Sequence, residues 1–169
     1  RWIHPPKHRH TIAAAGPSRQ RASTRHLGGG SIWPLTRVRG VTDVARRHRL
    51  ATHLDGARLM NAAVASGVAA REWAGLFDSA WIDFTKGLGA PAGTMLVGSK
   101  DFIARAKRAR KILGGVMRQS GVLAAAGLYA LEHNVERLAE DHANAERLAK
   151  GIGAAPPQSN MVFADSAPG

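Results

Sequence analysis

The stretch HLDGARLMNA, residues 53–62, places a carboxylate and a guanidinium three residues apart, between an apolar run and an amphipathic run. Residues i and i+2 of a strand share a face, so His53 and Asp55 are expected to point the same way. Ligands of open α/β sheets gather at the carboxyl ends of the strands, where Arg58 can fold back over the same crevice. The pair could hold a ligand that carries a protonated ring nitrogen and an anion. Spacing alone favours the alternative, in which Asp55 caps the following helix and Arg58 forms a surface salt bridge.

A single lysine, Lys86, leaves an apolar strand and enters the loop KGLGAPAG, within residues 83–99. Three glycines and a proline in the next seven positions cannot form a helix interior, so they predict a tight loop that leaves the amine approachable. A lysine in a semi-buried site can lose its proton and bind a carbonyl carbon covalently. Taken by itself, Lys86 is equally consistent with an ordinary exposed lysine.

An aspartate, an arginine and a lysine at successive strand ends match what pyridoxal phosphate requires. Lys86 would bind the aldehyde carbon, and Asp55 would keep the pyridine nitrogen protonated so that the ring accepts electrons. Arg58 would then contact an anion beside the ring.

The elements that position these residues predict an α/β fold. Apolar spacing indicates helices and strands in alternation from about residue 28, and one long helix near the end of the chain. Helices are expected at 35–49, 57–67, 71–77, 100–113 and 119–151, and strands at 50–54, 79–85 and 93–99, with a further strand beginning at residue 160.

Most of the formal net charge of +12 comes from the first third of the chain, because residues 1–49 hold 11 Lys and Arg against one acidic residue. We interpret residues 1–27 as an irregular basic segment and do not expect nucleic-acid binding. Three histidines in this segment lack supporting carboxylates or cysteines, so we expect no metal site there; they are His4, His8 and His10. The chain has no cysteine, and no apolar run long enough to predict a membrane span.

The stretches HLDGARLMNA and DFTKGLGAPAGTMLVGS, the long run at residues 108–149 and SNMVF at 159–163 together resemble the low-specificity threonine aldolases. The resemblance extends from about residue 23 to residue 165. It implies part of the large domain of the fold-type-I pyridoxal-phosphate enzymes. It also implies cleavage of L-threonine and L-allo-threonine to glycine and acetaldehyde.

Residue roles follow from the resemblance at the matching positions. Lys86 matches the lysine that binds the cofactor covalently, and Asp55 matches the aspartate that pairs with the pyridine nitrogen. Arg58 matches the arginine near the cofactor's 3-oxygen and the substrate carboxylate.

A second set of residues matches the family less directly. Lys111 and Arg118 lie in RKILGGVMRQ, a region that approaches the active site and the subunit interface in the family. His53 precedes the DGAR motif and is expected to be a supporting partner. No metal is implied.

The same resemblance predicts a small β-hydroxy amino acid substrate, a homotetramer, a cytoplasmic location and no membrane contact. We expect residues 28–153 to be a partial cofactor-binding domain and residues 154–169 to be a linker into a further small domain. The chain is expected to be truncated at both ends and to lack the family's phosphate-binding turn. The alternatives are another pyridoxal-phosphate-dependent β-eliminating lyase, or an inactive fragment with a basic nucleic-acid-binding tail.

Overall fold

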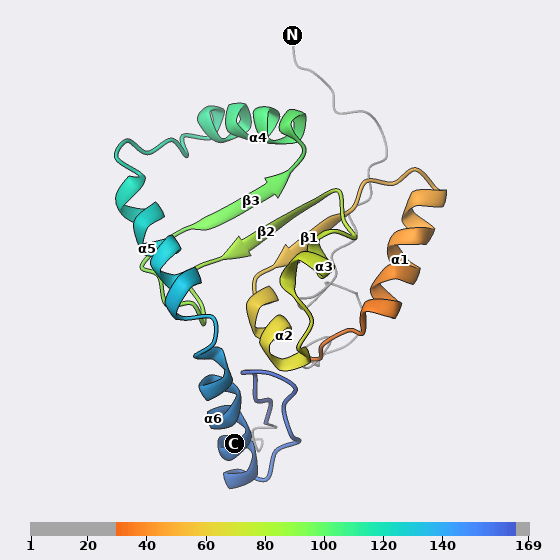
Figure 1. Cartoon of the computed structure of the whole chain (residues 1–169), viewed down its shortest axis with the longest axis vertical. Helices are drawn as coiled ribbons and strands as arrows, with labels where there is room; N and C mark the ends of the chain where they lie inside the picture. Colours follow the sequence, from red (N-terminus) through yellow and green to blue (C-terminus); the bar gives the residue numbers. More distant parts are fainter. Residues whose placement is uncertain (1–29, 165–169) are drawn as a thin grey trace, which may run out of the picture.

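Three short strands form one mixed sheet at the centre of the chain (Figure 1). The computed structural model describes residues 30–164. β1 and β2 are parallel, β3 is antiparallel to β2, and the order across the sheet is β1-β2-β3. The bounds are His53–Gly56 for β1, Ser79–Asp83 for β2 and Thr94–Gly98 for β3.

The register of β1 against β2 places their carboxyl ends at the same edge of the sheet. His53 lies opposite Ser79, and Asp55 lies opposite Trp81. Since alternate residues share a face, all four residues lie on the same face. β1 begins later than the predicted start at residue 50, because it forms only where it can pair with β2.

The opposite face of the sheet is covered by the first three helices, which build an apolar core (Figure 1). Leu54 of β1 and Ala80 of β2 are both buried in it, at 0% and 2% exposure. α2 ends at Gly67, whose left-handed φ of 69° favours glycine. The helices are α1 (Leu35–Arg47), α2 (Leu59–Ser66) and α3 (Ala70–Ala74), and the core also contains Val38, Leu59, Trp73 and Leu76.

The second half of the chain is helical. α4 (Lys100–Ile112) follows β3, and the Ser99 hydroxyl caps it by accepting the Phe102 amide at 3.2 Å. Where one helix over 119–151 was predicted, the structure contains two, so that prediction is wrong. They are α5 (Gly121–His133) and α6 (Leu138–Gly151), separated at residues 134–137.

A second core joins the loop after β2 to these two helices. Phe84 and Leu88 from the loop pack with Ala130 of α5 and Leu138 of α6. The Asn134 side chain, between the helices, donates a hydrogen bond to the Leu88 carbonyl at 2.7 Å. The loop that carries Lys86 is therefore held by the α5–α6 junction.

Residues 152–164 run back beside α6 without forming a strand (Figure 1). The strand predicted from residue 160 is thus wrong over residues 160–164. The Gln158 side chain instead accepts a hydrogen bond from the Ile32 amide at 2.7 Å. The predicted basic segment at 1–27, with its histidines, lies outside the described residues.

Candidate functional site

Asp55 stands at the carboxyl end of β1 with one carboxylate oxygen committed to the backbone. Its Oδ1 accepts a hydrogen bond from the Ala57 amide at 3.1 Å. α2 begins after Arg58 and has no side-chain cap, so the capping alternative for Asp55 is not realised. The half-buried carboxylate is held in the turn and is available to a ligand through its other oxygen.

Gly56 is required by the close approach of the two parallel strands. A Cβ atom at this position would overlap the carbonyl oxygen of Trp81 on β2. The buried glycine therefore lets the chain turn at the strand end while Asp55 remains beside Trp81.

Arg58 carries an unsatisfied buried donor. Its Nε atom is buried and has no hydrogen-bond partner. Within residues 30–164 the ion pairs are Arg46–Asp43 and Lys86–Asp83, so the surface salt bridge considered for Arg58 is not formed there. Buried polar atoms without a partner are rare and costly, which marks Arg58 as a group that a ligand could satisfy.

Lys86 follows β2 and pairs with Asp83, the last residue of that strand. Its Nζ donates to Oδ2 of Asp83. Oδ1 of the same carboxylate accepts the Thr85 amide at 2.8 Å and the Thr85 hydroxyl at 2.6 Å. Burial raises the pKa of the Asp83 carboxyl, but the hydrogen bonds from Lys86 and Thr85 outweigh it and lower the pKa to about 2. Asp83 is therefore a buried, ionised partner for the lysine.

Trp81 of β2 is a neighbour of both Asp55 and Lys86. The Lys86 Nζ lies 5.7 Å from the centroid of the Trp81 ring, and Trp81 is the register partner of Asp55. Asp55 and Lys86 thus lie at the same edge of the sheet, and both neighbour one aromatic residue. Sequence reasoning did not single out Trp81 or Asp83. The alternation that placed His53 and Asp55 on one face could have found them, because they also alternate along β2.

The loop after Lys86 is closed by its own backbone. The Gly89 amide donates to the Lys86 carbonyl at 2.9 Å, and the Ala90 amide donates to the Phe84 carbonyl at 2.8 Å. Gly89 and Gly93 have φ values of 70° and 117°, which few other residues adopt. The glycine-rich run therefore forms the fixed tight turn expected from the sequence.

His53 supports the same face from β1. Its Nδ1 lies 2.8 Å from the Ser79 hydroxyl oxygen on β2. Burial lowers the pKa of His53, and the charge of Asp55 opposes that shift. The ring is accordingly neutral at pH 7 and bridges the two strands beside Asp55.

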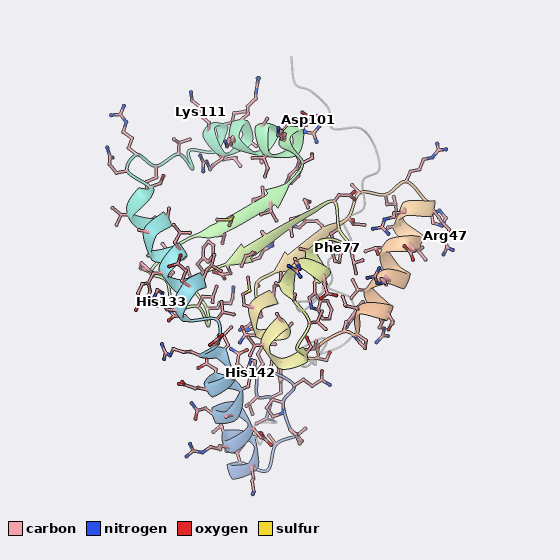
Figure 2. The ribbon with its side chains drawn as sticks, viewed as in Figure 1. Arg47, Phe77, Asp101, Lys111, His133 and His142 are labelled. Carbon is pink, nitrogen blue, oxygen red and sulfur yellow. The ribbon has the colours of Figure 1, made fainter. Side chains whose placement is uncertain are left out.

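Lys111 and Arg118 lie on exposed parts of the chain. Lys111 belongs to the last turn of α4, and Arg118 to the connection that follows it. α4 starts at the opposite edge of the sheet from Asp55, because β3 is antiparallel, and it packs beside β3 (Figure 2). The structure describes no contact between these two residues and Asp55, Arg58 or Lys86.

Comparison with known proteins assigns the chain to a protein family. The beta-eliminating lyase model matches residues 21–164. The chain belongs to the beta-eliminating lyase family. The low specificity L-threonine aldolase of Escherichia coli K12 is 44% identical over 146 residues, and low-specificity L-threonine aldolase 1 of Arabidopsis thaliana is 42% identical over 151 residues. These matches cover 83% and 85% of this chain, but 44% and 42% of the relatives.

A solved structure agrees with the sequence relatives. A protein of Exiguobacterium sp. 255-15, described as an aromatic amino acid beta-eliminating lyase/threonine aldolase, superposes with a TM-score of 0.71 at 30% identity. The match covers 79% of this chain and 40% of that one. The predicted α/β fold, part of the fold-type-I architecture, is confirmed. The chain spans less than half the length of these relatives.

Family members depend on pyridoxal phosphate, so the described residues can be compared with that group. The cofactor offers an aldehyde carbon, a ring nitrogen and anionic oxygens. Lys86 provides an amine, Asp55 a carboxylate with one oxygen open, and Arg58 a buried donor without a partner. The donor set therefore fits the cofactor.

The sequence predicted neither a membrane span nor a metal site, and two observations concern these points. No helix within residues 30–164 is both long enough and apolar enough to cross a membrane. In the same part of the chain, no three His, Asp or Glu side chains gather as metal ligands would.

Proposed function

We propose that this chain is part of a pyridoxal-phosphate-dependent lyase that cleaves the Cα–Cβ bond of L-threonine and L-allo-threonine. The products are glycine and acetaldehyde. The observation that carries the proposal is the placement of Asp55 and Lys86 at one sheet edge, in a chain 44% identical to a low specificity L-threonine aldolase. The substrate class rests on the names of the relatives.

Bound pyridoxal phosphate supplies an electron sink for the electrons released when a bond at Cα breaks. In the proposal, Lys86 holds the cofactor through its amine. Asp55 carries a negative charge beside the ring nitrogen and so keeps a proton there. The buried Nε of Arg58 donates to an anionic oxygen of the cofactor or the substrate.

The remaining predicted residues have lesser parts in the proposal. His53, neutral and bonded to Ser79, keeps the face beside Asp55 in place. Lys111, in the last turn of α4, and Arg118, in the α4–α5 connection, contribute to a site that forms with a second subunit. We further propose a homotetramer in the cytoplasm, as the family resemblance implies; light scattering of the purified protein and cell fractionation test these two points.

The test begins with a titration of the purified chain with pyridoxal phosphate, followed by borohydride reduction and peptide mapping. The modified residue is expected to be Lys86, and the modification is expected to disappear in Lys86→Ala. Lys107→Ala, which changes an exposed lysine of α4, is the control and should retain it. Modification that persists at the same level in Lys86→Ala would refute the assignment of the lysine.

The reaction is tested separately by product analysis. L-threonine and L-allo-threonine should each yield equimolar glycine and acetaldehyde. Amino acids with a leaving group at Cβ distinguish the alternative, because a β-eliminating enzyme would release pyruvate or a related keto acid and ammonia from them. A loaded protein that performs only elimination would overturn the proposed substrate class.

A further inference from the structure

Asp83 is a buried carboxylate whose oxygens are both committed. Its side chain is 6% exposed, and Thr85 donates two hydrogen bonds to one oxygen. The second oxygen holds the Lys86 amine. An ionised carboxylate in a buried position requires charge-assisted partners. The structure provides them within three residues of the same strand end.

Two neighbouring groups attract the Lys86 amine. The carboxylate of Asp83 is in direct contact with Nζ, and the face of the Trp81 ring lies 5.7 Å away. Aromatic rings attract ammonium ions through their negative faces. An amine attacks an aldehyde carbon through its lone pair, so it must first be uncharged. The surroundings of Lys86 therefore oppose its attack on free aldehydes.

We propose that Asp83 is a positioning residue that holds the Lys86 amine at the carboxyl end of β2 until the cofactor displaces this contact. The inference rests on the proposed role of Lys86. After the lysine leaves, Thr85 still donates two hydrogen bonds to Asp83, so the buried carboxylate keeps hydrogen-bond partners. Asp83 thereby aims the amine and limits its reaction with other carbonyl compounds.

The test measures the reactivity of Lys86 without any pyridoxal phosphate. The full chain is treated with formaldehyde and sodium cyanoborohydride, and methylation of each lysine is followed by mass spectrometry. Lys150, an exposed residue in the last turn of α6, is the internal reference. In Asp83→Asn, the rate for Lys86 relative to Lys150 should rise about threefold to tenfold, because the carboxylate that holds the amine is lost.

Two variants separate this effect from a general loosening of the loop. Asp83→Glu restores a carboxylate and should return the Lys86 rate to within about twofold of the native chain. Asp43→Asn removes the other i,i+3 ion pair, on α1, and should leave the Lys86 rate unchanged. An unchanged or lower Lys86 rate in Asp83→Asn overturns the proposal, and so does an Asp83→Glu rate as high as that of Asp83→Asn.

A measurement on the native chain keeps the inference testable if Asp83→Asn does not fold. Raising NaCl from low concentration to 1 M screens a partly exposed ion pair, so Lys86 should gain reactivity relative to Lys150. A constant or falling ratio overturns the proposal. Because no cofactor is added, this outcome is independent of the borohydride mapping, which tests the proposed function.

Discussion

Gly87, directly after Lys86, has no room for a side chain. A Cβ atom there would lie 2.6 Å from Cδ2 of Leu138, whose side chain is buried at 1% exposure. Gly87→Ala is expected to destabilise the chain by about 1–2 kcal/mol. Overpacking costs about 1–3 kcal/mol, and the reduced freedom of the unfolded chain returns about 0.4–1 kcal/mol.

A double-mutant cycle isolates this contact. Leu138→Ala alone should cost about 2–5 kcal/mol, because it leaves a cavity in the second core. In that background Gly87→Ala no longer meets Cδ2, and it should become neutral or stabilising by up to about 1 kcal/mol. The expected coupling between the two positions is about 2 kcal/mol.

Urea denaturation of the four chains, followed by circular dichroism, measures each free energy of unfolding. Gly40→Ala is the matched control, because a Cβ atom at this exposed position of α1 meets nothing within 4 Å. That change should stabilise the chain by up to about 1 kcal/mol. Equal effects of Gly87→Ala in the two Leu138 backgrounds would refute the packing argument, because the clash would then not involve Leu138.

Two pH dependences follow from groups in the same region. The pKa of Asp83 is lowered from 3.8 to about 2, so its contribution to stability is present above pH 4 and lost as the pH falls toward 2. Thermal melts between pH 4 and 2 should therefore show a smaller loss of stability for Asp83→Asn than for the native chain. His142 of α6 contacts the Asn61 side chain of α2 at 3.2 Å, and burial lowers its pKa below 6.5 against the opposing charge of Asp141. The neutral form of His142 is therefore the one that the fold favours, and the stability of the native chain should decline as the pH falls below 6.5. This decline should be steeper than in His142→Gln. Equal slopes of stability against pH in the two chains would show that His142 does not carry the effect.

The sequence predicted the order of most elements but not the ends that tertiary contacts decide. Apolar periodicity continues across residues 134–137, so it could not reveal that Asn134 binds the Leu88 carbonyl where α5 ends. The strand expected at residue 160 had suitable residue types, but a strand also requires a neighbour to pair with. Likewise, β1 begins at His53 because its pairing with β2 begins there.

For the candidate site, the position of Asp55 and Lys86 at strand ends could be predicted from local pattern. Spacing could not exclude the alternatives, in which Asp55 caps a helix and Lys86 is an ordinary exposed lysine. Whether a side chain caps a helix or forms an ion pair depends on contacts made in the fold. Alternation along β2 could have placed Asp83 on the face of Asp55, but a carboxylate at a strand end gives no sign of being buried. Only the structure shows that Asp83 is buried and that Lys86 is its ion-pair partner.

The close approach of β1 to β2 beside Asp55 depends on a residue that has no side chain. At Gly56 the Trp81 carbonyl of β2 occupies the space that a Cβ atom would take, so a side chain there would overlap the backbone of the neighbouring strand. Any larger residue would act as a wedge and move Asp55 away from the strand that leads to Lys86. Gly56 therefore keeps Asp55 beside the strand that leads to Lys86.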